Sequence, residues 1–374
     1  MENISLTATT AFGLEAVTKR EIEALGYKIT DSKDGQISFE GSPEAIVKSN
    51  LWLRTADRVY IRLGEFRATS FEELFEKTKS LPWENWIRED FNFIISGSSA
   101  RSTLHSVPAC QSIVEKAIIK RLSSIYNCEW FSKKGPRLSV RFMLQKDICA
   151  MLIDTSGAGL HKRGYRVASV AAPIKETLAS AMVQLSFFKE GRLMVDPFCG
   201  SGTIAIEAAM LARNIAPGLS RDFDARAWGI IPEELWKSEK QKAFSAIKQG
   251  AKFVIEASDI DPKAVKAAKE NAIEAGVDDC IDFKVKDARK LEAETEHGMI
   301  ITNPPYGERI GDKKTNLQLY SSLAEYIRKN PTWSLFLITS DKGFEKAFGR
   351  NADRRRKLYN GRIESCYYQY HGEK

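Results

Sequence analysis

The tetrapeptide Asn303-Pro304-Pro305-Tyr306 combines residue types suited to chemistry at an exocyclic amino group of a nucleic-acid base. Such an amine is a poor nucleophile because its lone pair is delocalised into the ring. The Asn303 side-chain oxygen and the Pro304 carbonyl can accept its hydrogens and steer the lone pair toward an electrophile. Tyr306 can stack on the base, and two prolines keep the backbone rigid. These four residues are predicted to be catalytic by positioning, without a nucleophile or a metal.

A glycine turn lies upstream, where Asp196-Pro197-Phe198-Cys199-Gly200-Ser201-Gly202-Thr203 joins a strand to a helix. Glycines at such a turn let the backbone approach a ligand at the carboxyl end of the strand. A dinucleotide site is the competing interpretation. However, the third glycine of that motif is absent, because Ile204 and Ala205 follow Thr203. Asp196 would also repel a pyrophosphate. The turn therefore favours a cofactor that carries an amine.

Two further acids end the next two strands of the pattern. Asp259 can accept both ribose hydroxyls of a nucleoside, and Asp287 can accept from an adenine amino group or simply cap a helix. The segment between the first two strands is long and has the character of an insertion. If it is not an insertion, Asp222 or Asp224 competes for the ribose role.

Strands and helices alternate through residues 173–374, which predicts a doubly wound, mostly parallel sheet. Its short apolar runs MIIT and LFLIT are typical of strands buried on both faces. The last two strands are joined by Asn360 and Gly361 and are expected to form a hairpin at the sheet edge. This order of elements places the acids, the glycine turn and Asn303 on neighbouring strand ends.

The first half has a different pattern, beginning β-α-β-β and continuing with shorter α/β units whose last two strands are expected to be antiparallel. We assign residues 1–156 to this α+β region, residues 157–172 to a basic linker around HKRGYR, and residues 173–374 to the sheet described above. No internal repeat is evident.

Composition restricts the classes of function. The chain has 374 residues and a net charge of +7, which favours an anionic partner without establishing one. Six scattered cysteines form no CxxC pair, so neither disulfides nor a metal site is expected. A signal peptide and an apolar run of about 18 residues are both absent from the pattern, and we therefore expect a cytoplasmic protein.

The ordered set of D-x-x-x-G-x-G followed by two strand-end acids resembles the class I S-adenosylmethionine-dependent methyltransferases. The resemblance implies a Rossmann-like domain that binds S-adenosyl-L-methionine and releases S-adenosyl-L-homocysteine. The cofactor-binding residues it implies lie on the strand ends, namely Asp196, Phe198, Gly200, Ser201, Gly202, Thr203, Asp259, Ile260, Asp287, Ala288 and Asn303. The NPPY motif fits amino-group methylation in general, including the DNA adenine enzymes.

The first half resembles a ferredoxin-like segment followed by a THUMP RNA-binding domain, with a core at about residues 45–156. The stretch SSARSTLHSVPACQSIVEKAIIKRL carries this likeness, and Arg101, Lys116, Lys120 and Arg121 within it are candidates for phosphate contacts, although a solvated helix face also explains them. Together with GLHKRGYR, NIAPGL and NPPYGER, these motifs resemble the RlmL-type guanine-N2 methyltransferases of large-subunit ribosomal RNA.

Two other basic segments have two interpretations each. Arg163 and Arg166 in the linker either hold RNA or pin the two halves together. Arg354, Arg355 and Arg356 form a cluster that is either a solvated loop or an RNA contact. We assign both groups to RNA binding.

The resemblance implies methyl transfer to N2 of a guanine in 23S ribosomal RNA, either free or in a large-subunit assembly intermediate. A tRNA guanine-N2 methyltransferase also combines THUMP with NPPY and is the first alternative. A non-catalytic RNA-binding assembly factor is the alternative of another class, and it predicts decay of NPPY or of the glycine turn, which the sequence does not show.

Overall fold

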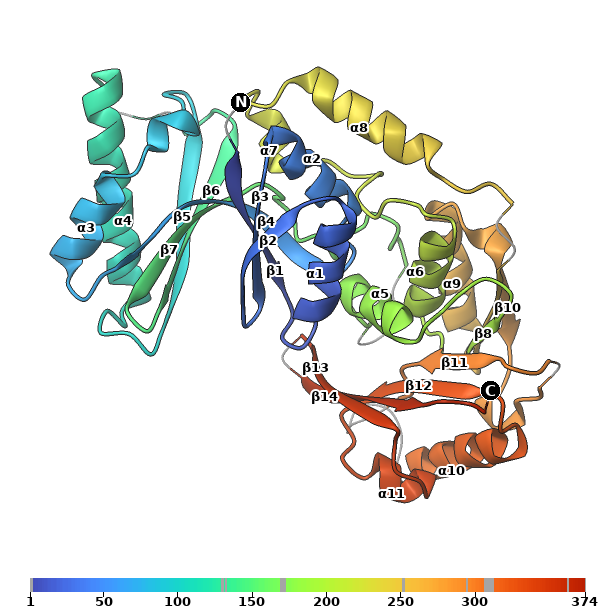
Figure 1. Cartoon of the computed structure of the whole chain (residues 1–374). Helices are drawn as coiled ribbons and strands as arrows, with labels where there is room; N and C mark the ends of the chain where they lie inside the picture. The colour runs from blue at the N-terminus through green and yellow to red at the C-terminus, as the bar shows by residue number, and fades with distance from the viewer. Residues whose placement is uncertain are drawn as a thin grey trace.

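Two seven-stranded sheets, one in each half of the chain, organise the protein (Figure 1). The structure is a computed structural model that describes residues 3–128, 131, 133–168, 173–250, 253–293, 295–305, 313–361 and 363–373, without the side chains of residues 313 and 314. Within these ranges, no helix has the length and apolar character needed to cross a membrane.

The first sheet has the strand order β2-β3-β1-β4-β7-β6-β5. Its strands are β1 (Ile4–Thr10), β2 (Lys28–Lys33), β3 (Gln36–Gly41), β4 (Ala56–Arg67), β5 (Asn92–Ala100), β6 (Arg137–Gln145) and β7 (Ile148–Asp154). The helices of this half are α1 (Glu15–Ala24), α2 (Pro43–Trp52), α3 (Phe71–Lys79) and α4 (Val107–Tyr126). The expected β-α-β-β start is confirmed, and the long strand β4 makes the two predicted modules one continuous sheet.

Alternation of apolar and polar residues explains which face of this sheet is covered. In β6, Leu138, Val140 and Phe142 are buried in the core beneath α3 and α4, whereas the residues between them face the other side. The predicted antiparallel pairing of β6 with β7 is confirmed. Lys146 and Asp147 both have positive φ angles, as a two-residue hairpin turn requires.

The second sheet has the order β10-β9-β8-β11-β12-β14-β13, and its first five strands are parallel. The strands are β8 (Leu193–Asp196), β9 (Val254–Asp259), β10 (Ile281–Val285), β11 (Met299–Thr302), β12 (Ser334–Thr339), β13 (Arg354–Asn360) and β14 (Ile363–Tyr370). The helices are α5 (Glu176–Leu185), α6 (Thr203–Ala212), α7 (Asp224–Ala227), α8 (Glu233–Ser245), α9 (Pro262–Glu274), α10 (Lys313–Lys329) and α11 (Phe344–Phe348).

Helices cover both faces of this sheet, as the apolar strands predict. Met299 and Ile301 of β11 pack with α5, α6 and α9, whereas Ile300 between them packs with α10 and α11. Figure 1 shows α10 and α11 on one side of β12 and β14 and α5 and α6 on the other. The fold is therefore the predicted doubly wound α/β domain.

The C-terminal hairpin is confirmed, because β13 pairs antiparallel with β14 and lies at the edge of the sheet. Of the two interpretations of the basic cluster, the solvated loop is wrong, since the strand already begins at Arg354, and the assignment to RNA binding stays a prediction. Its backbone is paired to β14 from Arg354 onward, opposite Gln369. Charged side chains on an edge strand discourage pairing with another chain, which gives these arginines a structural role as well.

The two halves interlock instead of meeting at a simple linker. The insertion that carries α7 and α8 folds back on the first half, where Phe223, Trp228 and Trp236 join its core. In the opposite direction, Leu14 and Val17, at the start of α1, are buried in the core of the second half. The predicted domain boundaries therefore divide the chain in sequence but not in space, because each hydrophobic core includes residues from both sides of the linker.

Arg163 in the linker is buried against Glu207 of α6, with side-chain exposures of 2% and 0%. Its Nε lies 3.3 Å from Glu207 Oε1, and its other nitrogens donate to the carbonyls of Leu160 and Arg54. The assignment of Arg163 to RNA binding is wrong, because its guanidinium is enclosed by protein. The other interpretation is confirmed, since the residue joins the first half, through Arg54, to the second.

Glu207→Gln should lower the free energy of unfolding by about 3–5 kcal/mol, because it leaves Arg163 buried without its counter-charge. Urea denaturation followed by circular dichroism measures the change. Asp279→Asn is the matched control, because it breaks the pair between Arg213 and an aspartate whose side chain is 63% exposed, and it should cost no more than about 1 kcal/mol. Equal effects of the two variants would contradict a structural role for the buried pair.

Candidate active site

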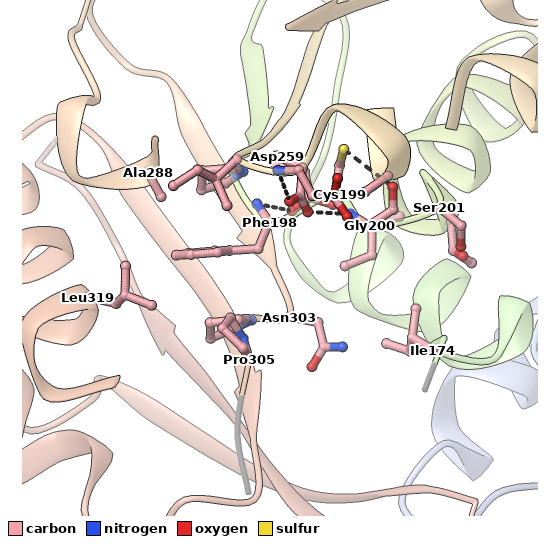
Figure 2. Close-up of a pocket in the computed structure, with 18 of the residues that line it drawn as sticks. Ile174, Phe198, Cys199, Gly200, Ser201, Asp259, Ala288, Asn303, Pro305 and Leu319 are labelled. Carbon is pink, nitrogen blue, oxygen red and sulfur yellow. Dashed lines mark hydrogen bonds between the residues drawn. The ribbon is translucent and has the colours of Figure 1, made fainter. Parts of the chain in front are cut away.

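A cavity of about 870 Å³ opens where β8, β9, β10 and β11 end, the position at which open parallel sheets bind ligands. Figure 2 shows part of its lining. The lining includes most of the residues predicted to bind the cofactor or to be catalytic, namely Asp196, Phe198, Gly200, Ser201, Thr203, Asp259, Ile260, Asp287, Ala288, Asn303, Pro304 and Pro305. Predicted site residues that lie more than 100 positions apart in sequence, such as Asp196 and Asn303, thus surround one cavity.

Asp196 ends β8 and is 1% exposed. Thr302 Oγ1 donates to its Oδ1 at 2.6 Å, and the Phe198 amide donates to the same atom at 3.3 Å. Its Oδ2 is buried without a hydrogen-bond partner among the described residues. Burial, reinforced by the nearby Asp259, raises the pKa of Asp196 to about 7. An unpaired buried carboxylate oxygen in a cavity is suited to a cationic ligand.

Asp259, at the end of β9, links this strand to the glycine turn. Its Oδ2 accepts from the Gly200 amide at 3.0 Å, and its Oδ1 accepts from the Asp261 amide at 3.0 Å. Figure 2 shows the bond between Asp259 and Gly200 at the centre of the site. Each carboxylate oxygen keeps acceptor capacity toward the cavity, as binding of a diol requires. The competing candidates Asp222 and Asp224 do not line the cavity, and Asp222 instead pairs with Arg226.

Asp287 lines the cavity and also caps a short helix, so its capping role is confirmed and its contact with an adenine amine stays a prediction. Its Oδ1 accepts from the Arg289 amide at 2.9 Å, and both oxygens accept from the Arg289 guanidinium. The Arg289 guanidinium holds the pKa of the Asp287 carboxyl below its usual range, which keeps this group ionised.

Gly202 is the predicted cofactor residue that the cavity lining does not include. It has φ +83° at the start of α6, and a Cβ there would lie 3.0 Å from Ala268 Cβ of α9. Gly202 therefore allows the close packing of α6 on α9. Its neighbours in the turn, Gly200 and Ser201, line the cavity.

Arg166 supports the glycine turn. Its Nε donates to Glu176 at 2.9 Å, and its two terminal nitrogens donate to Ser201 Oγ at 3.1 Å and Thr203 Oγ1 at 3.0 Å. A further bond reaches the carbonyl of Ile174, another residue of the lining. The guanidinium thus makes four hydrogen bonds within the protein, and the assignment of Arg166 to RNA binding is replaced by a role in positioning the turn.

Asn303 directly follows β11, with its Oδ1 buried and without a partner among the described residues. In Figure 2 its side chain lies between Pro305 and Ile174. Pro304 and Pro305 also line the cavity, whereas Tyr306 lies outside the described residues. Among the described residues, the cavity therefore contains two buried acceptors without a hydrogen-bond partner, Asp196 Oδ2 at the end of β8 and Asn303 Oδ1 just after the adjacent strand β11.

Sequence reasoning missed part of the wall. Pro173 and Ile174 come from the segment before α5, and the opposite side is formed by Thr315, Leu319, Ser340, Asn360 and Ile363. These residues carry no distinctive local motif. Ser340 could have been predicted from the order of strands and helices, because it directly follows the parallel strand β12 and therefore lies at the same edge of the sheet.

The lining carries acids, amide and hydroxyl groups, and no cluster of ligands suited to a metal occurs in the described ranges. Burial raises the pKa of the Cys199 thiol well above its usual range, so this cysteine is not a thiolate nucleophile. The donor set fits S-adenosyl-L-methionine, since Asp196 can hold an ammonium, Asp259 a ribose and Asp287 an adenine amine.

The basic residues assigned to RNA binding lie in different environments. Lys116 and Lys120 are exposed on α4, and Arg101 is exposed in the turn after β5. Arg121 instead forms a two-point ion pair with Glu84, so its charge is already balanced. In the C-terminal cluster Arg354 is exposed, Arg355 pairs with Glu345, and Arg356 has a buried Nε with no partner in the described structure.

Comparison with family models matches three consecutive parts of the chain. Residues 5–60 match the RlmL ferredoxin-like domain, residues 68–154 match the THUMP domain, and residues 163–369 match the RMKL-like methyltransferase domain. The boundary between the first two matches falls in and just after β4, the strand that both parts of the first sheet share.

Similar proteins cover nearly the full chain. The "Putative RNA methyltransferase YpsC" of Bacillus subtilis (strain 168) is 46% identical over 99% of this chain and 96% of its own length. The crystal structure of "SMU.472, a putative methyltransferase complexed with SAH" has a TM-score of 0.93 and 39% identity, over 100% of this chain and 99% of that one. A "predicted N6-adenine-specific DNA methylase" from Listeria monocytogenes str. 4b F2365 has a TM-score of 0.94 and 44% identity, over 100% and 97%.

Together with the geometry of the cavity, these matches establish the predicted family and its cofactor class. The chain belongs to the RMKL-like methyltransferase family, with RlmL ferredoxin-like and THUMP domains preceding a Rossmann-like, S-adenosylmethionine-dependent methyltransferase domain.

Proposed function

We propose that the protein transfers a methyl group from S-adenosyl-L-methionine to the exocyclic N2 of a guanine in 23S ribosomal RNA. The observation that carries the proposal is a pair of acceptors in one cavity that have no partner among the described residues, Asp196 Oδ2 for a cationic cofactor and Asn303 Oδ1 for an amine. Ribosomal RNA as the substrate implies a cytoplasmic enzyme.

The cofactor end of the cavity is formed by the three acids and the glycine turn. Asp196 binds the ammonium group, Asp259 accepts from the ribose hydroxyls, and Asp287 accepts from the adenine amine. Gly200, with φ +52°, brings the backbone close to the ligand. When bound, the cofactor supplies an electrophilic methyl group on a sulfonium centre.

The target end is formed by Asn303, Pro304 and Pro305. The Asn303 Oδ1 and the Pro304 carbonyl accept the two hydrogens of the guanine amine, which directs its lone pair toward the methyl group. Phe198 and Pro305 supply apolar surface for the base. Alignment of the two reactants contributes up to roughly 7–11 kcal/mol, so the reaction needs no covalent intermediate.

RNA as the polymer is supported by the THUMP match and by the name of the Bacillus relative. The guanine N2 atom and the 23S molecule are supported by resemblance to the RlmL type. A tRNA guanine-N2 methyltransferase and a non-catalytic assembly factor remain the alternatives, and the Listeria structure's name adds an adenine amine as a further outcome to test.

Methyl transfer from radiolabelled cofactor to ribosomal RNA and tRNA of cells lacking this gene should yield N2-methylguanosine in large-subunit RNA. Chromatography of the digested nucleosides identifies the product and its carrier. Label in tRNA would favour the first alternative, N6-methyladenosine would contradict guanine as the target, and binding without transfer would favour an assembly factor.

Asn303→Ala should lower kcat about 100-fold or more, because the amine loses an acceptor that acts in the transition state. Single-turnover transfer measures the rate, and cofactor titration shows whether binding persists. Asn303→Asp keeps acceptor oxygens at the same position and should retain more activity than the alanine variant. Equal activity of the wild-type and alanine proteins would exclude the proposed role.

Cofactor affinity should rise with pH between about 5 and 7 and level off above pH 7. Asp196 has a folded-state pKa raised to about 7, so the free protein carries a proton there below this pH, and an ammonium binds better once that proton is released. Isothermal titration calorimetry in buffers of different ionisation enthalpy measures both the affinity and the proton release.

The same shift affects stability with the opposite trend. Because burial raises the pKa of Asp196 above its unfolded value, the contribution of this residue to the stability of the ligand-free protein is lost as pH rises from about 4 to 7. Asp196→Asn should remove the pH dependence of cofactor affinity and this one contribution to the pH dependence of stability, and it should weaken cofactor binding at pH 8. Wild-type affinity that is constant from pH 5 to 8 would refute the ammonium assignment.

A further inference from the structure

The first sheet has a second face that helices α3 and α4 do not cover. The register of β4, β7, β6 and β5 fixes which residues share it. Tyr60 of β4 lies opposite Asp154, which lies opposite Ser139 of β6. In the next row Arg141 lies beside Ser96 of β5. Their neighbours in sequence, such as Ile61 and Val140, point into the core instead.

This second face is hollowed at the end nearest the linker. The hollow has a volume of about 150 Å³ and is lined by Arg58, Tyr60, Ser96, Arg137, Ser139, Arg141, Asp154 and Gly157. It is smaller than the roughly 300–1,000 Å³ of pockets that hold whole cofactors or drug-sized ligands. A single compact group is therefore the ligand that fits it.

The hollow carries more positive than negative charge, because three arginines line it with Asp154, and one further carboxylate, Asp224 beside Gly157, interacts electrostatically with Arg137. Arg58 is paired with Asp154 and also donates to the Gly157 carbonyl. Asp154 in turn accepts from the amides of Ser156 and Gly157. Neither Arg137 nor Arg141 forms an ion pair or a side-chain hydrogen bond with any residue in the described part of the chain. The hollow therefore attracts an anion.

Neutral donors accompany the two cations. Burial raises the pKa of Tyr60 to about 12, so its hydroxyl keeps its proton at neutral pH. The hydroxyls of Ser139 and Ser96 face the same space, although Ser96 already donates to the Val140 carbonyl. Planar guanidinium groups with hydroxyl donors match the oxygens of a phosphate, which can accept from several directions at once.

We propose that this hollow binds a phosphate of the RNA backbone, with Arg137 and Arg141 as the charged contacts. The inference rests on the proposed function in that the polymer is RNA, but it does not depend on which base is methylated. It places the RNA contact of the first half on the uncovered sheet face, and not on helix α4, from which the sequence motif was read.

The position of the hollow connects it with the other half. Gly157, where the linker begins, forms part of its wall, and a Cβ at Gly157 would lie 2.2 Å from Asp224 Oδ1 of α7. The Trp228 indole, just after α7, donates to the Arg137 carbonyl at 2.9 Å. An RNA phosphate in the hollow is thus held at the junction between the THUMP half and the insertion of the methyltransferase half.

The test compares Arg137→Ala/Arg141→Ala with Lys116→Ala/Lys120→Ala, which removes two exposed charges from α4. Filter binding of 23S ribosomal RNA transcribed in vitro is measured from 50 to 300 mM salt, with cofactor affinity as a check on folding. Arg137→Ala/Arg141→Ala should bind the RNA at least about tenfold more weakly than the wild-type protein. The slope of log affinity against log salt should fall by about 0.7–0.9, the loss of one phosphate contact.

Arg141→Lys keeps the charge and loses the planar donor pair, so it should retain the salt slope with weaker affinity. If Arg137→Ala/Arg141→Ala and Lys116→Ala/Lys120→Ala weaken RNA binding equally, the effect is one of net charge and the proposal is overturned. Binding of Arg137→Ala/Arg141→Ala at the wild-type affinity would also overturn it. Because the readout is binding, failure to find N2-methylguanosine would count against the proposed reaction and leave the phosphate site intact.

Discussion

The parallel alignment of β8, β9, β10 and β11 is the constraint on which the rest of the site depends. Parallel strands bring all their carboxyl ends to one edge, and in this chain each of those ends carries a polar residue. Asp196, Asp259, Asp287 and Asn303 thus meet without any of them being near another in sequence. Helices on both faces bury the deepest of these groups, which raises the pKa of Asp196, whose Oδ2 has no partner among the described residues.

The interlocking of the two halves maintains the orientation of the RNA-binding region relative to this edge. Phe223, Trp228 and Trp236 from the insertion complete one core, and Leu14 and Val17 complete the other. The buried pair of Arg163 and Glu207 lies between them, where misalignment would leave a charge without a partner. An exchange of this kind joins the first half to the second sheet at several points besides the linker.

Charge is distributed in opposite senses over the two binding regions. The cavity is acidic at the cofactor end, which suits a ligand that carries an ammonium and a sulfonium. The uncovered face of the first sheet and the outer side of α4 are basic, which suits a polyanion. A net charge of +7 describes neither region, because it averages an acidic pocket with basic surfaces.

The sequence by itself determined the class of enzyme, the order of elements and about half of the cavity lining, 12 of its 25 residues. Strand-end motifs such as NPPY and DPFCGSGT are local in the chain, and the parallel topology converts local positions into a common edge. Only the tertiary structure decided the roles of the cations, since an arginine in a basic segment has the same letter whether it is free or paired. It buried Arg163, turned Arg166 toward the glycine turn, balanced Arg121 with Glu84, and placed Arg137 and Arg141 on a sheet face without an ion pair to any described residue. Those outcomes depend on partners 35 to more than 100 residues away or on strand register, which no local pattern encodes.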